Sequence, residues 1–145
     1  MNCELCNTPG GEVLWTDARC RIVLVGDADY AGYCRVIWNT HIAEMTDLSA
    51  RDQAHCMRVV LAVESVLREL MKPDKINLAS LGNFTPHVHW HVIPRFHDDA
   101  HFPQAIWGAR RLEPQQHSRH LTIDTVDLRT RLGNTLLQLI LLPDC

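Results

Sequence analysis

The segment Pro86-His87-Val88-His89-Trp90-His91-Val92-Ile93-Pro94 alternates histidine with apolar residues and decides the fold. Successive side chains of a β-strand point to opposite faces, so a strand here places the three imidazoles on one face and the apolar residues on the other. Adjacent histidines then lie about 7 Å apart, and the outer two lie about 13 Å apart. The two prolines favour a strand that begins and ends with this run.

A row of three groups that titrate near neutrality is typical of a functional site. The spacing argues against one metal ion bound by all three, because metal–nitrogen bonds of about 2 Å cannot reach both outer rings. Two of the three can still share a metal. A solvated strand edge is a further alternative, but the apolar opposite face argues against it. The favoured interpretation is an active site in which one imidazole is the nucleophile and its neighbours orient it or transfer protons.

The rest of the chain predicts further strands and one long helix. Strands are predicted at residues 13–15, 20–25, 33–38 and 76–81. Between the last two of these, apolar residues recur with helical spacing up to Met71, and Pro73 ends the helix. Ser49 with Asp52 resembles a capping box at its start, and Thr46 is a rival cap. Three strands, a helix and two strands with local connections favour an α+β domain, in which a small antiparallel sheet of about five strands is covered by the helix.

A second helical segment is predicted near the C-terminus, over residues 124–142. Leucine or isoleucine recurs there every four residues, although Gly133 weakens the helix. Residues 108–120, rich in arginine, glutamine and histidine, look like a linker. We therefore expect a domain over residues 1–107 and an extension over residues 108–145, both within one globular unit.

The composition is that of an ordinary globular protein, with 145 residues, 46% hydrophobic and 21% charged. A net charge of −3 provides no broad basic field for a nucleic acid polymer, although a small anionic ligand needs only local donors. No apolar stretch approaches the ~20 residues of a membrane span. The N-terminus has no signal-peptide pattern, and the six cysteines then indicate reduced thiols in the cytoplasm.

The histidine run and its surroundings resemble the histidine triad (HIT) family. Residues 87–93 fit the pattern His-φ-His-φ-His-φ-φ that names the family, and residues 77–86 resemble the strand and turn before it. Residues 36–42 resemble the strand and histidine that precede the family's helix. The resemblance covers about residues 2–107 and implies a small α+β domain, commonly a homodimer. It also implies a nucleotide hydrolase or transferase that acts at the α-phosphorus of phosphoramidates, phosphoesters or dinucleoside polyphosphates.

The resemblance implies distinct roles for the three histidines. His89 is the expected nucleophile, which forms a nucleotidyl-histidine that water then hydrolyses. Its far ring nitrogen should donate to an acceptor such as a neighbouring backbone carbonyl, and His87 is expected to buttress it. His91 is expected to bind an α-phosphate oxygen or to protonate the leaving group. This chemistry requires no cofactor.

Four residues are substrate-binding candidates by the same resemblance. Asp27 is expected to accept hydrogen bonds from ribose hydroxyls, with Asp29 as the runner-up. Asn83 and Thr85 are expected to contact a phosphate or the leaving group, and Arg95 to add positive charge near the phosphates. For each of them, an ordinary loop or strand-end residue is the alternative.

Two positions depart from the family pattern. Phe84 stands where relatives often carry serine or threonine, which makes Thr85 the candidate for supplying the hydroxyl. Tyr33 stands where part of the family has a further histidine. These departures keep open a second hypothesis, a nucleotide-binding module with little turnover.

Cys3 and Cys6 have the spacing of half a zinc site, with free thiols as the alternative. In relatives that bind zinc, the pair is completed by the histidine before the helix and the first triad histidine, which here are His41 and His87. The resemblance thus implies a structural Cys₂His₂ site apart from the chemistry at His89. A zinc protein without nucleophilic chemistry is the third hypothesis.

Overall fold

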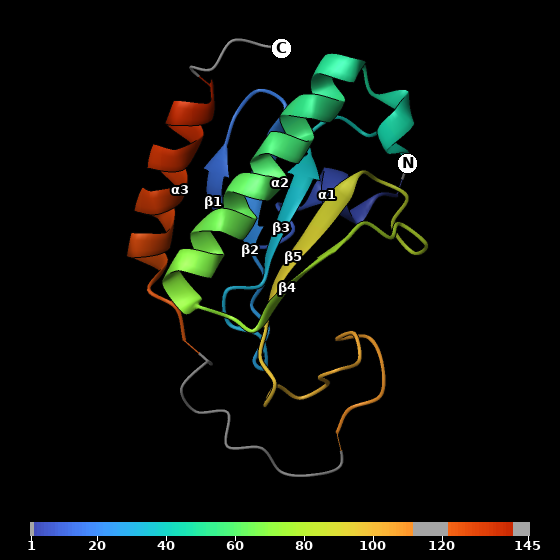
Figure 1. The fold of residues 1–145 in the computed structure, drawn as a ribbon. Coiled ribbons are helices and arrows are strands. Elements are labelled where there is room, and N and C mark those ends of the chain that lie inside the picture. The colour runs from blue at the N-terminus through green and yellow to red at the C-terminus, as the bar shows by residue number, and fades with distance from the viewer. Residues whose placement is uncertain (1, 112–121, 141–145) are drawn as a thin grey trace.

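The computed structural model describes residues 2–111 and 122–140, which form one antiparallel sheet with two long helices on the same face (Figure 1). The elements in chain order are α1 (Glu4–Asn7), β1 (Glu12–Thr16), β2 (Cys20–Leu24), β3 (Cys34–Trp38), the 3₁₀ helix η1 (Met45–Asp47), α2 (Ala50–Met71), β4 (Lys75–Ala79), β5 (His89–Arg95) and α3 (Thr125–Ile140). The sheet has five strands in the order β1-β2-β3-β5-β4, and each neighbouring pair is antiparallel. The predicted α+β fold is confirmed.

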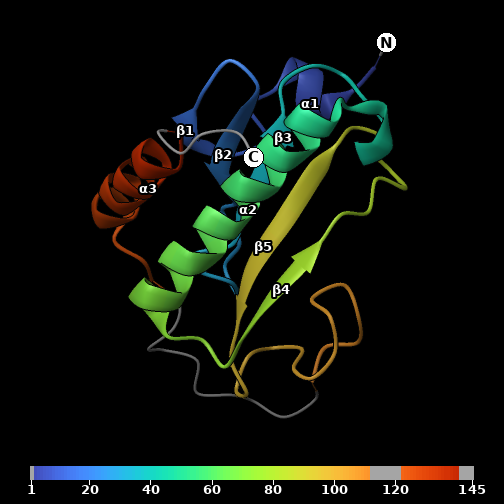
Figure 2. The same cartoon turned by 45° about the horizontal axis from the view of Figure 1, so that its top comes forward.

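The long helix α2 begins where its capping box predicts. The Ser49 hydroxyl accepts the backbone N–H of Asp52 at 3.1 Å, while Thr46, the rival cap, lies in η1. The helix ends at Met71, and Lys72 follows in the left-handed conformation with φ of 48°. Its 22 residues cross the sheet, and α3 lies beside it next to β1 (Figure 2).

The main core lies between these two helices and one face of the sheet. Val88, Trp90 and Val92, the apolar alternates of the histidine run, pack into it. The C-terminal helix contributes Leu128, Leu132 and Leu136 to the same core, each 0–1% exposed. Residues 112–121 and 141–145 lie outside the described residues, and with them most of the linker predicted for 108–120 and the helix end predicted at 142. Among the helices that are described, none has the length and apolar character to cross a bilayer.

The ends of the histidine strand differ from the prediction. The strand β5 begins at His89 and runs through Pro94 to Arg95. Pro94 pairs with Ile76 of β4, whereas β3 pairs with β5 only as far as Val92. Among the described strands, one side of β5 therefore has no partner at Pro94, which is the position where a residue without an N–H is tolerated.

The other face of the sheet carries the histidines between two small apolar clusters. One cluster joins Cys3 and Leu5 of the N-terminal segment to Val23 and Ile37. The other, near the β2–β3 loop and residues 96–111, contains Tyr30, Tyr33 and Ile93. The N-terminal segment and the loop after β5 lie toward opposite ends of the sheet (Figure 1). This arrangement gives the histidine row two different ends, one beside the cysteines and one beside the tyrosines.

Candidate functional site

His89 is held in one tautomer by the backbone of its own strand. Its Nδ1 lies 2.6 Å from the carbonyl oxygen of His87, and the residue is 8% exposed. A carbonyl only accepts, so Nδ1 carries the proton and Nε2 keeps its lone pair. The Ser80 hydroxyl donates to the His89 carbonyl at 2.9 Å and ties this residue to the end of β4. The free Nε2 lone pair is what a nucleophilic imidazole needs.

His91 is paired with Tyr33, one of the two residues at which the sequence departs from the resemblance. The Tyr33 hydroxyl lies 2.6 Å from His91 Nδ1, and both residues are buried. Burial, followed by the electrostatic influence of His89 and Arg35, lowers the pKa of His91 to about 4, so the ring is neutral at pH 7. Burial also raises the pKa of Tyr33, which therefore keeps its proton. A hydroxyl that donates to Nδ1 leaves the His91 proton on Nε2, where it can donate to a phosphate oxygen.

Trp107 covers the His91 end of the row. Its ring centroid is 4.9 Å from that of His91, with the ring planes at 72°. Trp107 is half exposed and belongs to the loop that follows β5. It therefore borders the site from the solvent side, in an edge-to-face arrangement typical of aromatic pairs.

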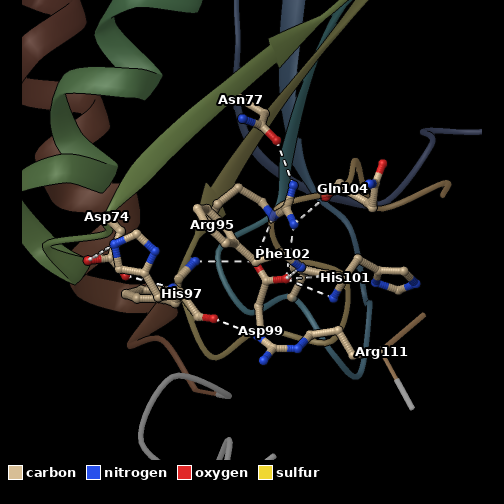
Figure 3. Close-up of polar contacts among 11 residues, drawn as sticks. Asp74, Asn77, Arg95, His97, Asp99, His101, Phe102, Gln104 and Arg111 are labelled. Atoms are coloured by element: carbon tan, nitrogen blue, oxygen red, sulfur yellow. Dashed lines mark hydrogen bonds and ion pairs between the residues drawn. The ribbon is translucent and has the colours of Figure 1, made fainter. Parts of the chain in front are cut away.

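This loop is anchored by a buried ion pair between Arg95 and Asp99 (Figure 3). Arg95, 1% exposed, donates to both carboxylate oxygens at 2.6 and 2.9 Å, to Asn77 Oδ1 at 2.7 Å and to the Gln104 carbonyl at 2.7 Å. Asp99 also accepts the backbone N–H groups of Phe96, His101 and Phe102. The guanidinium is thus occupied by protein acceptors, and the substrate-binding role expected of Arg95 stays a prediction without support from these contacts.

Asp99 titrates far below its ordinary range because of this network. Burial raises its pKa, but the Arg95 guanidinium and the backbone donors outweigh burial and lower the pKa to about 2. Asp99 is therefore ionised at neutral pH. Its charge holds the turn from which the loop carrying Trp107 departs.

His87 faces the cysteines at the other end of the row. Its Nε2 lies 2.6 Å from the Trp38 carbonyl, to which it donates, so Nδ1 keeps a lone pair. That Nδ1 lies 3.4 Å from Cys3 Sγ and 3.5 Å from Cys6 Sγ. Burial lowers the pKa of His87, which favours the neutral ring that a metal requires.

The four predicted metal ligands come together in the fold. Cys6 Sγ is 3.4 Å from His41 Nδ1, and the donor atoms of Cys3, Cys6, His41 and His87 all lie within 4.8 Å of one another. Donors around a tetrahedral zinc are separated by roughly 3.3 to 3.8 Å, given bonds of about 2.0 to 2.3 Å. The Trp38 carbonyl supplies the outer hydrogen bond that ligating histidines usually make. These residues fit a metal ion.

The remaining substrate-binding candidates lie on exposed or half-buried loops. Asp27 is exposed, and its Oδ1 accepts the backbone N–H of Asp29 at 2.8 Å. Asn83 is exposed, and Thr85 lines a cleft of about 600 Å³ together with Cys3 and His41. Within residues 2–111 and 122–140, no hydrogen bond joins the side chain of Asp27, Asn83 or Thr85 to His89, and their roles stay predictions.

Sequence reasoning missed one residue of the histidine face. Arg35 of β3 lies directly opposite His91 of β5 in the antiparallel register. The available signal is a charged residue inside an otherwise apolar strand, but it does not show which face of the sheet carries the charge.

Comparison with known proteins places this arrangement in a family. A family model, the HIT domain, matches residues 10–98. A curated relative, "AP-4-A phosphorylase" of Mycobacterium tuberculosis, is 26% identical over 85 residues, which are 54% of this chain and 44% of that relative. The chain thus spans less than half the length of the curated relative that it matches.

Solved structures show the same fold. A histidine triad protein from Marinobacter aquaeolei VT8 has a TM-score of 0.71 at 23% identity and covers 96% of this chain and 97% of its own. A histidine triad family protein from Mycobacterium smegmatis, described as Zn-bound, has a TM-score of 0.63 at 21% identity and covers 95% and 98%.

Proposed function

This chain belongs to the HIT family, and we propose that it is a nucleotide hydrolase or transferase that acts through a nucleotidyl-histidine on His89. Its substrates are nucleoside phosphate derivatives attacked at the α-phosphorus, namely phosphoramidates, phosphoesters or dinucleoside polyphosphates. The observation that carries this proposal is the hydrogen bond from His89 Nδ1 to the His87 carbonyl, which leaves Nε2 free to attack. The similarity to an AP-4-A phosphorylase supports a nucleotide as the substrate.

In this mechanism each of the three histidines has a separate role. His89 Nε2 forms a bond to the α-phosphorus while the bond to the leaving group breaks, and water then displaces His89 to release the nucleotide. The neutral His91 donates its Nε2–H to a phosphate oxygen or to the departing group. His87 acts through its carbonyl, which orients His89. Because the pKa of His91 is about 4 in the protein without substrate, hydrogen bonding is favoured over protonation as its role.

Trapping the intermediate tests the proposal directly. The full chain is mixed with adenylated and guanylated phosphoramidates, phosphoesters and dinucleoside polyphosphates, quenched at alkaline pH and analysed by intact-mass spectrometry. We expect one nucleotidyl group per chain, located on the peptide that contains His89. Tight nucleotide binding with neither adduct nor product would support the binding-module hypothesis instead.

Replacing Tyr33 with phenylalanine is expected to reduce kcat about tenfold while the fold persists, because one buried hydrogen bond to His91 Nδ1 is lost. The pH profile should change as well, since His91 loses the donor that selects its tautomer. Tyr30→Phe is the matched control, because the Tyr30 hydroxyl bonds to Asp99 and His101 instead. Equal losses of kcat in both variants would contradict a positioning role for Tyr33.

We also propose that Cys3, Cys6, His41 and His87 hold one structural zinc ion. When bound, zinc would cross-link the N-terminal segment to the start of the histidine strand. The spacing of the four donors and the lone pair on His87 Nδ1 support this assignment. The homodimer expected from the family and the cytoplasmic location expected from the cysteines stay predictions.

Loss of the cysteine pair tests the zinc assignment. A Cys3→Ser, Cys6→Ser variant is expected to contain no zinc by elemental analysis, against about one per chain in the unaltered protein. Zinc binding stabilises a folded protein by about 4 kcal/mol when free zinc is at 1,000 times its Kd. The double variant, which lacks this contribution, should therefore also have a lower Tm. Cys34→Ala, which removes a buried thiol of β3 outside the ligand set, should keep its zinc. Metal-free protein purified without chelator would refute the assignment.

A further inference from the structure

Arg35 is a half-buried cation on the histidine face of the sheet. It lies opposite His91 in the β3–β5 ladder, and directly opposed residues of an antiparallel pair project to the same face with Cβ atoms about 4.5 to 5.5 Å apart. Its Nε is buried and has no hydrogen-bond partner within residues 2–111 and 122–140. A buried donor without an acceptor costs free energy unless a ligand or water satisfies its group.

No ion pair joins Arg35 to a carboxylate among the described residues. Its Cζ lies 5.8 Å from the centroid of the Tyr33 ring, and Tyr33 in turn contacts the neutral His91. Arg95 differs from Arg35, because its guanidinium donates to Asp99, Asn77 and the Gln104 carbonyl. Arg35 also forms a side-chain hydrogen bond with Tyr33, which leaves its charge unbalanced and its Nε without a partner among the described residues. A half-buried arginine without a counterion beside a catalytic imidazole is positioned to receive an anion.

The register indicates where that anion would sit. His89 lies opposite Ile37, and His91 lies opposite Arg35, two residues further along β3. Two strand residues span about 7 Å, so Arg35 serves the His91 end of the row and not the nucleophile itself. The planar guanidinium offers five N–H donors, and its geometry matches a pair of phosphate oxygens.

We propose that Arg35 binds a second phosphate of the substrate, beyond the one that His89 attacks, and so selects nucleotide derivatives that carry a polyphosphate. This inference rests on the proposed function and narrows its substrate class. In the mechanism above, the leaving group then carries a phosphate held between Arg35 and the His91 end of the row.

Selectivity between two substrates tests the role of Arg35. Arg35→Met is expected to lower kcat/KM for a dinucleoside polyphosphate by about 10- to 100-fold, the loss of a charge-assisted contact, while kcat/KM for a nucleoside phosphoramidate changes by less than about threefold. Arg35→Lys should restore part of the loss. Arg68→Met, on the exposed side of α2, removes the same charge elsewhere and should alter neither value. Equal losses on both substrates would overturn the inference.

A binding measurement separates this inference from the proposed function. Inorganic tripolyphosphate is titrated calorimetrically into the unaltered full chain and into the Arg35→Met and Arg68→Met variants. We expect Kd to rise at least about tenfold for Arg35→Met alone. Unchanged affinity in Arg35→Met overturns the inference, even if the enzyme is active. Absence of any adduct or product in the unaltered chain overturns the proposed function, even if Arg35 binds the anion.

Discussion

The His89→Ala variant is expected to lose turnover by at least about 10³-fold and to form no nucleotidyl adduct. In the proposed mechanism the attacking lone pair is that of His89 Nε2, and the His87 carbonyl keeps the proton of this ring on Nδ1. Product formation from adenylated substrates and intact-mass spectrometry measure both effects. The loss should appear in kcat, because the bond to phosphorus cannot form, while nucleotide affinity should change little.

A matched histidine variant controls for the loss of an imidazole. His55 of α2 is paired with Asp17 at 2.7 Å and takes no part in the histidine row, so His55→Ala should lower Tm without lowering kcat. Imidazole added to a His89→Gly variant should restore part of the turnover, because it can occupy the vacated space. An active His89→Ala protein with a covalent adduct on another histidine would show that the nucleophile is misassigned.

The Asp99→Ala variant is expected to lower the free energy of unfolding by about 3 to 5 kcal/mol, the cost of leaving a buried charge unpaired. Arg95 would lose its carboxylate, and the N–H groups of Phe96, His101 and Phe102 would lose their acceptor. Urea unfolding with linear extrapolation measures the change. Arg110→Ala breaks the exposed pair with Asp29 and should cost no more than about 1 kcal/mol.

The same carboxylate predicts how stability depends on pH. Its pKa is about 2 in the folded chain against an ordinary value of 3.8, so the folded state favours the ionised form. This contribution is present above about pH 4 and is lost as pH falls from there toward 2. Asp99→Asn should remove that part of the acid-induced loss, as unfolding free energies measured at a series of pH values would show. An identical acid slope in both proteins would contradict the role given to Asp99.

Much of the fold could be predicted from local sequence patterns. The alternation at residues 86–94 predicted which side chains face the core, and Val88 and Val92 do pack there. The cap at Ser49 predicted the start of α2, because a capping bond joins residues three apart. Pro94 was misjudged as a strand end, since its tolerance within β5 depends on where β3 stops pairing.

Only part of the candidate site could be predicted from the sequence. The sequence was enough to predict the row of histidines and the cysteine pair. The two histidines that complete the cysteine site were predicted from the resemblance to the family. Arg95 was expected near the phosphates, and its engagement with Asp99 was not foreseen, because it depends on how the loop after β5 folds back. Arg35 was missed for a similar reason, since its place opposite His91 follows from the pairing of β3 with β5.

The amino-acid sequence by itself determined the secondary structure and the common face of the three imidazoles, because strand alternation, helical period and capping act over a few residues. Only the tertiary structure decided the surroundings of each imidazole, with His87 beside the thiols, His89 bonded through Nδ1 to the His87 carbonyl and His91 against Tyr33. These contacts join segments far apart in the chain. Strand register and loop packing set them, and both depend on interactions across the whole domain.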